Sequence, residues 1–296
     1  MHIPWNDLQL FLAIAEGGSL SAAAKRLRVT QPTVSRRIAE LESNVGETLF
    51  ARGVEGVTLT SFGERLVEPA RRMAEWAAEA DRTAERLESK PRGSVRITAP
   101  PGIAYDFLAP FAAWAKTRLP DVHLEVVATV QYLDLSRREA DIALRFAAPA
   151  QRDVDTLASL DLEVAAFASP AYAKTLSRRY TVRDVAWIAW APPFDHLSPG
   201  PELAKLIPGF VPAFASDDYL VQLRAAEAGL GAMFLGRVEN RFIRSPLVEL
   251  DLELGLIPRT LYLASARSAM AIPRVRAIAD LLASELGRTV AKKKKR

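Results

Sequence analysis

The stretch from Ser19 to Glu42 constrains the fold of this chain more than any other. Ser21 is placed to cap a short helix that runs through Leu27, and Thr30 is placed to cap a second helix. The second helix turns its apolar side chains inward at spacings of four, three and four residues, and these are Val34, Ile38, Leu41 and Val45. Two helices joined by a short turn, with the polar N-terminal half of the second exposed, predict a helix-turn-helix.

The charge of this stretch is concentrated in one sign. Five basic residues and no acidic residue lie between positions 25 and 37, namely Lys25, Arg26, Arg28, Arg36 and Arg37. A merely solvated face would intersperse acids among such cations, whereas DNA phosphates complement them. We therefore predict that this stretch binds double-stranded DNA.

The second helix of a helix-turn-helix enters the major groove of DNA with its N-terminus first. Gln31, Thr33 and Ser35 place hydrogen-bonding groups in its first turns, where base edges come within reach. Arg36 is suited to a bidentate contact with guanine. The candidate contacts to phosphates are Lys25, Arg28 and Arg37.

The net charge of the whole chain does not by itself indicate a nucleic-acid partner. The chain has 39 basic and 35 acidic residues, and its last five residues, KKKKR at 292–296, are all basic. Removing these five leaves 34 basic residues against 35 acidic ones. The prediction of DNA binding therefore depends on the local cluster. We expect the tail to be a solvated end, with non-specific phosphate contact or an added extension as alternatives.

Composition excludes several other classes of protein. The chain has no cysteine, which removes disulfides, zinc fingers, iron–sulfur ligation and thiol sensing, and we expect no cofactor and no metal. No apolar run approaches the roughly 20 residues needed to span a bilayer. The N-terminal sequence MHIPWNDLQLF lacks the basic region and cleavage site of a secretory signal. We therefore expect a cytoplasmic protein with no membrane partner, and not a transport-type binding protein, which would need such a signal.

An enzyme is the other alternative class. The sequence has no G-x-S-x-G, H-E-x-x-H or Walker motif and only three histidines. The motif GLGAMFLG at 229–236 has the first two glycines of a dinucleotide loop, but the spacing to the third is wrong and the motif follows a helical pattern. We expect that the protein is not an enzyme, and substrate turnover would contradict this.

Three regions follow one another along the chain. Residues 1–60 carry the helix-turn-helix and a short turn-rich segment. Residues 61–90 form one long helical pattern with an alanine-rich apolar stripe, made of Phe62, Leu66, Met73, Ala77, Ala80, Ala84 and Leu87. Such a stripe suits a partner helix, the alternative being a helix packed on its own domain. In residues 91–290 strand-like and helical runs alternate, which predicts an α/β domain with a largely parallel sheet, and residues 291–296 are the basic tail.

The sequence resembles the LysR-type transcriptional regulators. The resemblance rests first on LQLFLAIAEGGSLSAAAKRLRVTQPTVSRRIAELESNVGETLFAR and GVTLTSFGERL, and then on DLSRREADIALRF, AAEAGLGAMFLG and PRVRAIADLLASEL. It runs from Trp5 to about Leu286, and only the first motif is highly specific. It implies an N-terminal winged helix-turn-helix, a long linker helix that dimerises, and a two-lobed α/β effector domain like a periplasmic binding protein. We expect the first lobe at about 91–161 and 266–290, and the second at about 162–265.

The resemblance also implies residue roles and partners. The positions that match its recognition-helix contacts are Gln31, Pro32, Thr33, Ser35 and Arg36. Arg52 matches the wing position that approaches the minor groove. The implied partners are operator DNA, a small-molecule effector and RNA polymerase, and the implied assembly is a homodimer or a homotetramer. The sequence departs from the family pattern at Gly236, where proline is usual, which weakens the carry-over of site residues near Leu235.

Ligands of two-lobed α/β domains bind where the carboxyl ends of strands face the crevice between the lobes. The candidate effector-binding residues at those ends are Thr98, Pro100, Pro101, Thr129, Arg145, Phe146, Trp190 and His196. Arg145 offers a bidentate site for a carboxylate beside the hydroxyls of Thr98 and Thr129. We therefore expect a small anionic effector with an apolar body, whose binding between the lobes modulates DNA binding.

Alternatives remain for several of these residues. Arg145 can instead pair with Asp141, which is nearby in sequence, or with another acid of its lobe. Trp187 is expected in the core rather than at the ligand, and His123 is expected to be a packed or surface histidine. The alternative for the whole domain is a cleft filled by its own side chains, with switching through a protein partner.

Overall fold

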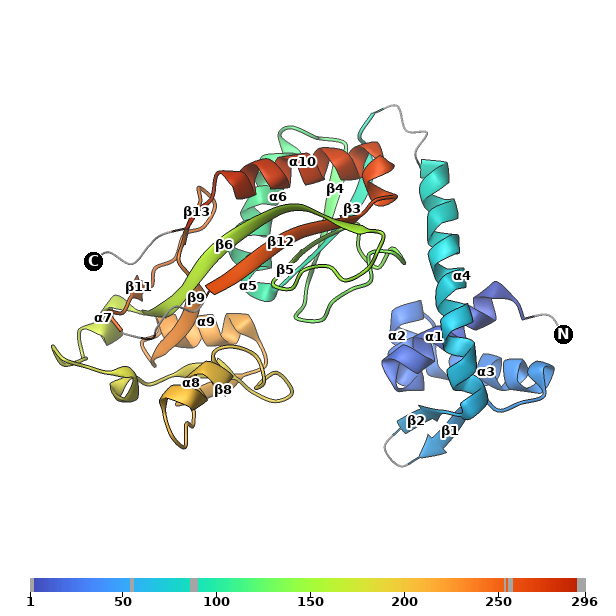
Figure 1. Cartoon of the computed structure of the whole chain (residues 1–296), viewed down its shortest axis with the longest axis horizontal. Helices are drawn as coiled ribbons and strands as arrows, with labels where there is room; N and C mark the ends of the chain where they lie inside the picture. Colours follow the sequence, from blue (N-terminus) through green and yellow to red (C-terminus); the bar gives the residue numbers. More distant parts are fainter. Residues whose placement is uncertain (1–2, 54–55, 86–89, 253, 255–257, 292–296) are drawn as a thin grey trace. The chain divides into compact units, whose positions relative to one another are not determined.

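The computed structural model describes residues 3–53, 56–85, 90–252, 254 and 258–291. The chain divides into two compact units, Met1–Ala84 and Glu85–Arg296, which Figure 1 shows coloured along the sequence. The basic tail at 292–296 lies outside the described residues, as do Leu87 and the side chain of Ala84 at the end of the predicted stripe.

The described part of the first unit contains helices followed by a β-hairpin and a long helix. Their bounds are α1 (Trp5–Gly17), α2 (Leu20–Leu27), α3 (Gln31–Val45), β1 (Phe50–Gly53), β2 (Gly56–Leu59) and α4 (Ser61–Glu85). Strands β1 and β2 pair antiparallel, with Phe50 opposite Leu59. Helices α2 and α3 with this hairpin form the predicted winged helix-turn-helix.

Local hydrogen bonds set the boundaries of α2 and α3. Ser19 caps α2 by accepting a backbone hydrogen bond at 3.1 Å, so the prediction that Ser21 is the cap is wrong. The reason is that Gly18 ends α1 with a left-handed φ of 63°, which leaves Ser19 as the next extended residue. Thr30 caps α3 as predicted. Arg28 turns the chain between the helices with a φ of 56°.

The core of the first unit lies between α1 and α3. Phe11 is fully buried and its ring centroid lies 5.4 Å from that of Phe50. The predicted inward face of α3 is confirmed, since its apolar residues are all buried, namely Val34, Ile38, Leu41 and Val45. Phe62, Leu66 and Ala70 of α4 pack on the same core. The first half of the linker helix therefore belongs to this unit.

Beyond Ala70, α4 exposes large apolar side chains. Met73 is 41% and Trp76 is 75% exposed, and Ala77 is half-buried. The predicted stripe contains Met73 and Ala77 but not Trp76. In the sequence Trp76 follows Glu75, so the pattern assigned it to the charged residues that flank the alanine-rich stripe. The largest exposed side chain of this face was thus missed.

The second unit is built on a mixed sheet with the strand order β11–β6–β12–β5–β3–β4, and β9 also pairs with β6. The bounds are β3 (Gly93–Ala99), β4 (Val122–Ala128), β5 (Ile142–Arg145), β6 (Val154–Ala168), β9 (Ala232–Gly236), β11 (Val248–Glu249) and β12 (Pro258–Ala266). Strand β3 runs parallel to β4 and β5, whereas β6 pairs antiparallel with β9, β11 and β12. The prediction of a largely parallel sheet is wrong, because hydrophobic periodicity locates strands without giving their direction.

Helices and shorter strands cover this sheet. In the first lobe they are α5 (Pro101–Ile103), the π-helical turn η1 (Ala104–Leu108), α6 (Ala109–Lys116), the 3-10 turn η3 (Ala269–Ala271) and α10 (Pro273–Gly287). In the second lobe they are α7 (Pro170–Ala173), η2 (Val182–Asp184), β7 (Ile188–Trp190), α8 (Gly200–Leu206), β8 (Phe214–Ser216) and α9 (Tyr219–Glu227). The last strands, β10 (Val238–Glu239) and β13 (Val290–Ala291), pair antiparallel.

Strand β6 belongs to both lobes. It is a single strand of 15 residues. Its part up to Glu163 pairs with β12, and its end from Val164 pairs with β9. Figure 1 shows β6 and β12 running side by side through the domain. Because β12 also pairs with β5, it lies in the sheet of the first lobe, whereas the sequence placed residues up to 265 in the second lobe.

A second departure from the predicted lobe boundary is the segment 240–242, which we call the Phe242 strap. It follows β10 but packs on the first lobe, where the Phe242 ring lies edge-on to Phe107 and Phe111. Arg241 donates two hydrogen bonds, of 2.9 and 2.7 Å, to the buried carboxylate of Glu285 in α10. The strap therefore joins a segment of the second lobe to the first lobe.

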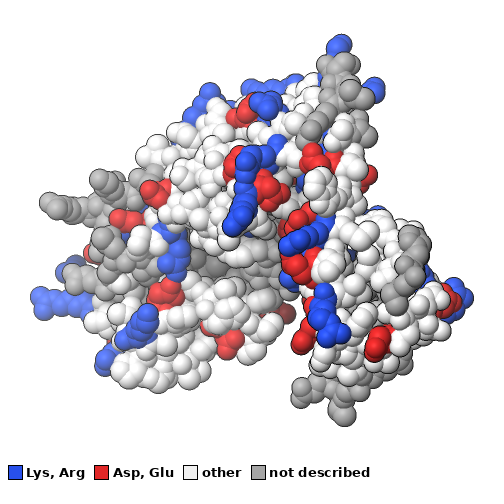
Figure 2. All heavy atoms as spheres, turned by 45° about the vertical axis from the view of Figure 1, so that its right-hand side comes forward, with Lys and Arg blue, Asp and Glu red and all other residues white. Residues whose placement is uncertain are grey.

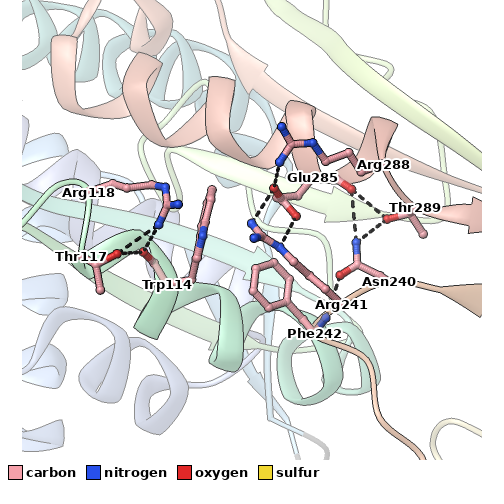
Figure 3. Close-up of polar contacts among 9 residues, drawn as sticks. All are labelled: Trp114, Thr117, Arg118, Asn240, Arg241, Phe242, Glu285, Arg288 and Thr289. Atoms are coloured by element: carbon pink, nitrogen blue, oxygen red, sulfur yellow. Dashed lines mark hydrogen bonds and ion pairs between the residues drawn. The ribbon is translucent and has the colours of Figure 1, made fainter.

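Stacked cations extend this attachment. Figure 3 shows Trp114 of α6 between two guanidinium groups, those of Arg118 at 3.9 Å and Arg241 at 4.3 Å from its ring. The Asn240 amide donates to the hydroxyl of Thr289 at 2.7 Å. Each strap residue thus has its own contact with the first lobe.

Candidate DNA-binding surface and effector cleft

Helix α3 presents its two faces to different surroundings. Opposite its buried apolar face, Gln31 and Pro32 are exposed, and Thr33 and Ser35 are half-buried. The Arg36 side chain is 73% exposed and makes only a loose ion pair of 3.7 Å with an acid on the next helical turn. Such an exposed pair adds little stability, so the guanidinium can move to a base edge.

The five predicted cations divide into two groups. Arg26 and Arg37 each form an ion pair with an acid of α1, at 2.8 and 2.7 Å, and so tie α2 and α3 to the first helix. Lys25 and Arg28 are exposed, and within the described residues neither takes part in an ion pair. The predicted phosphate contacts thus comprise two free cations and Arg37, which is already paired.

Arg52 lies in β1 of the hairpin, but its side chain is outside what the structure describes. On the face drawn in Figure 2, basic and acidic side chains are interspersed.

A cleft of about 1130 Å³ opens between the two lobes of the second unit. It brings together all eight predicted effector residues, namely Thr98, Pro100, Pro101, Thr129, Arg145, Phe146, Trp190 and His196. Its volume slightly exceeds the roughly 300–1,000 Å³ of typical small-molecule sites, so it has room for such a ligand. The described structure therefore contains an open cleft, in contrast to the alternative of one filled by its own side chains.

Arg145 is the most unusual residue of this cleft. It is only 6% exposed, and its Nε and Nη2 atoms are buried with no hydrogen-bond partner. The alternative pairing with Asp141 is not among the ion pairs of the described residues; that carboxylate accepts the backbone N–H of Arg96 at 2.8 Å. Burial lowers the pKa of Arg145, and Tyr132 and Asp134 oppose this effect. A buried guanidinium without an acceptor is costly, which makes Arg145 a candidate anion site.

The remaining predicted residues take the following places. The Thr129 hydroxyl accepts the N–H of Gln131 at 3.0 Å, and its own proton is left for another acceptor. Trp190 packs edge-on to Phe194 at 6.0 Å, forming an apolar wall. Trp187 is 2% exposed, as expected for a core residue. His123 lies exposed on β4, the outermost strand of the sheet.

A hydrogen bond between the lobes was not predicted from the sequence. Tyr219, at the start of α9, donates its hydroxyl to Asp106 of η1 at 3.2 Å. Burial raises the pKa of Asp106, the hydrogen bond from Tyr219 opposes this, and the charge of Glu227 adds to it. A Cβ on Gly102 would lie 3.0 Å from the Tyr219 ring, so glycine permits this close approach.

A second contact between the lobes was also missed. Glu202 of α8 pairs through Oε1 with Arg259 of β12, and both residues line the cleft. The other carboxylate oxygen, Oε2, is buried with no hydrogen-bond partner. Only the three-dimensional structure brings together residues so distant in sequence.

The departure at Gly236 has a structural counterpart. Gly236 ends β9, and the next residue, Arg237, is 9% exposed and pairs with Glu163 and Glu249 at 2.7 Å each. The ion pairs of Arg237 hold the backbone that follows β9 in place, in a protein that lacks the proline usual at position 236.

Two other features bear on the class of protein. No helix in the described part of the chain is both long and apolar enough to cross a membrane. In the same residues, no group of three or more histidine, cysteine, aspartate or glutamate side chains is arranged to hold a metal ion.

Comparison with known proteins follows the division into two units. Residues 5–64 match the bacterial regulatory helix-turn-helix proteins of the lysR family, and residues 88–287 match the LysR substrate binding domain. An HTH-type transcriptional regulator of Xanthomonas campestris pv. campestris is 34% identical over 167 residues, which are 56% of this chain and 48% of the relative. The chain spans less than two thirds of the length of the curated relatives it matches.

Solved structures support the fold. The full-length virulence activator AphB of Vibrio cholerae aligns with a TM-score of 0.58 and 20% identity, over 95% of this chain and 99% of that one. Full-length CbnR complexed with its target DNA aligns with a TM-score of 0.52 and 19% identity, over 97% and 99%. The relatives are named as transcriptional regulators and not as enzymes. The two matched domains together account for most of the sequence, and the chain belongs to the LysR family.

Proposed function

We propose that this chain is a sequence-specific DNA-binding transcriptional regulator whose DNA binding is modulated by a small anionic effector held between the two lobes. The observation that carries the proposal is α3, with four buried apolar residues on one face and an exposed polar N-terminal half on the other. This is the geometry of a helix that is fixed to its domain and reads bases with its free face.

The base contacts in this proposal come from Gln31, Thr33, Ser35 and Arg36. Lys25 and Arg28 contact phosphates, because both are exposed and unpaired among the described residues. We place Arg37 closer to a structural role, because it is held by its ion pair of 2.7 Å with Asp7.

The anionic nature of the effector is proposed from a comparison of two arginines. Arg241 directs its Nε and Nη2 atoms at both oxygens of Glu285. Arg145 has the same two atoms buried without a partner. A carboxylate satisfies both donors at once, as Glu285 does for Arg241. Tyr132, which is 61% exposed and lies 5.8 Å from the Arg145 guanidinium, moves aside to admit it.

The assembly in this proposal is a homodimer formed along the second half of α4. Met73 and Trp76 supply the exposed apolar surface that a second copy covers. Trp76→Glu should therefore convert the dimer to monomers in light scattering. A Trp76→Glu protein that remains dimeric would remove this face from the interface.

DNA binding is tested by selecting bound sequences from a pool of random DNA and then footprinting the protein on the most enriched sequence. We expect a two-fold symmetric site with half-sites separated by whole helical turns. Lys25→Ala and Arg28→Ala should each weaken selected and random DNA alike and lower the salt dependence by about one counterion. A protein that binds all sequences equally would contradict the proposal.

Effector binding is tested by thermal-shift measurements with aliphatic and aromatic carboxylates. Lobe closure couples to DNA binding if the ligand favours one arrangement by about 1–3 kcal/mol. Arg145→Ala should abolish the stabilisation by carboxylates. Stabilisation that survives this substitution would retain the cleft and remove Arg145 as its anion anchor.

A further inference from the structure

Buried polar side-chain atoms without a hydrogen-bond partner are rare in folded proteins, and here three of them gather at one place. Within the described residues there are five such atoms, on Arg82, Trp114, Arg145 and Glu202. Three of the five, Nε and Nη2 of Arg145 and Oε2 of Glu202, belong to residues that line the cleft between the lobes. Each unsatisfied group raises the free energy of the ligand-free protein, so a ligand that draws the two side chains into the cleft and satisfies all three atoms is favoured.

The three atoms include both hydrogen-bond donors and a hydrogen-bond acceptor. The Arg145 atoms are donors on a cation, and Glu202 Oε2 is an acceptor. The charge of Glu202 is already balanced, because its other oxygen pairs with Arg259. Glu202 therefore requires a hydrogen-bond donor and does not require a further positive charge.

The two residues come from opposite lobes. Arg145 ends β5 in the sheet of the first lobe. Glu202 lies in α8, whose neighbouring residue Leu203 is fully buried in a core of the second lobe. A ligand that binds both residues contacts both lobes, whereas a simple carboxylate satisfies only the Arg145 side.

We infer that the effector is a small carboxylate that also carries a hydroxyl or ammonium donor, with the carboxylate on Arg145 and the donor on Glu202. This inference rests on the proposed function of the cleft and adds the second recognition group. The neighbouring carboxyl of the cleft, Asp106, is already bonded to Tyr219 and is not the acceptor in this arrangement.

The test compares ligands that differ only in the donor, bound to the full chain and measured by calorimetry. One series is benzoate, 4-hydroxybenzoate and 4-(aminomethyl)benzoate, and the other is hexanoate, 6-hydroxyhexanoate and 6-aminohexanoate. In at least one series we expect a donor-bearing member to bind about tenfold more tightly than its parent, the change produced by one hydrogen bond of ordinary strength. The hydroxyl and ammonium members distinguish the two kinds of donor.

Variants then assign the effect to the two residues. Arg145→Gln should weaken every member of a series by a similar factor. Glu202→Met should abolish the advantage of the donor-bearing member over its parent carboxylate. Both should bind somewhat more tightly, because the substitution frees the Arg259 cation in the cleft. Glu202→Gln, which keeps one acceptor oxygen, should retain the advantage of the hydroxyl more than that of the ammonium. Arg259→Gln is the matched control, because it breaks the same ion pair but keeps the Glu202 carboxylate. It should keep the preference for a donor and shift that preference toward the ammonium, because the charge of Glu202 is then no longer balanced.

The outcomes separate this inference from the proposal on which it rests. Carboxylates that bind through Arg145 with no preference for a donor would overturn the inference and leave the anionic effector in place. A donor preference that survives Glu202→Met would also overturn it. Failure of all six compounds to bind would overturn the anionic effector and the inference together, while sequence-selective DNA binding is judged separately.

Discussion

The two units of this chain hold their recognition groups in opposite settings. In the first unit the predicted DNA contacts on α3 are exposed or half-buried, above a closed apolar core. In the second unit Arg145 is buried and Glu202 partly so, in the walls of a cleft, and they come from separate segments of the chain. Exposed cations keep their hydration until they meet a partner, so their binding depends strongly on salt. Buried groups already carry the cost of desolvation, so a ligand that pairs them gains more from each contact.

This difference predicts how substitutions in each unit affect binding and stability. Surface substitutions on α3 should alter binding without altering the fold, because the core beneath them is complete. Substitutions in the cleft should alter stability and binding together, because its polar groups also join the lobes.

The strongest test of this separation is Phe11→Ala, which removes a fully buried ring from the first unit. We expect a loss of about 3–5 kcal/mol from the unfolding free energy of that unit. The unfolding transition of the second unit should not change, because its apolar clusters are separate. Calorimetry checks this, with Leu263→Ala as the reciprocal variant in the second unit. Transitions that shift together would show that the two units do not unfold independently.

The second test is Arg36→Ala on the exposed face of α3. We expect the affinity for the selected DNA site to fall by about 1–3 kcal/mol, with relaxed base preference at one position in each half-site. The unfolding free energy should stay the same, since the side chain is 73% exposed. Binding titrations and repeated selection measure this. Arg37→Ala is the control, for which we expect the opposite result. Its unfolding free energy should fall by about 0.2–1 kcal/mol through loss of the ion pair, and its base preference should not change. Wild-type affinity of Arg36→Ala would contradict its assignment as a base reader.

A smaller effect is expected from Tyr219→Phe. The variant keeps the ring against Gly102 and removes the hydroxyl that bonds to Asp106 across the cleft. The second unit should lose about 0.5–1.5 kcal/mol in denaturant unfolding, the usual contribution of one hydrogen bond. The first unit should be unaffected, and an unchanged second unit would mean that this bond does not hold the lobes together.

The smallest effect concerns pH. Because burial raises the pKa of Asp106, the folded second unit binds this proton more tightly than the unfolded chain does. Protonated Asp106 therefore stabilises the folded second unit fully below the ordinary aspartate pKa. This contribution to the unfolding free energy is lost as pH rises through the raised pKa of the folded state. The facing titratable groups are Tyr105 and Glu227, with Tyr219. Asp106→Asn should remove this slope from urea unfolding measured across the acidic range, and a slope that persists would assign it to another group.

Much of the first unit could be predicted from the sequence, because its signals are local. The cap at Thr30, the spacing of the buried residues of α3 and the cluster of cations all lie within one short stretch. Two features were not predicted correctly. The cap of α2 is Ser19, two residues before the predicted Ser21. The exposed Trp76 was left out of the apolar stripe, although it is next to Ala77 in the sequence.

The second unit was less predictable, because its site depends on long-range pairing. The strand ends correctly located one wall of the cleft, including Arg145. Periodicity did not reveal that β6 continues from one lobe into the other, since its residues 154–161 include polar positions. It also gave no reason to place Asp106 beside Tyr219, or Glu202 beside Arg259, because these pairs form only when the lobes meet.

The Phe242 strap has a consequence for the direction of any motion between the lobes. A body tethered at one point can turn about any axis through it, whereas a body tethered at separate points keeps only the rotation about the line that joins them. The second lobe is tethered through β6 and β12, and separately through the strap, which Arg241 fastens to α10. If the lobes open and close, these tethers confine the motion to rotation about one axis. We expect ligands of different size to change how far the lobes turn and not the direction in which they turn.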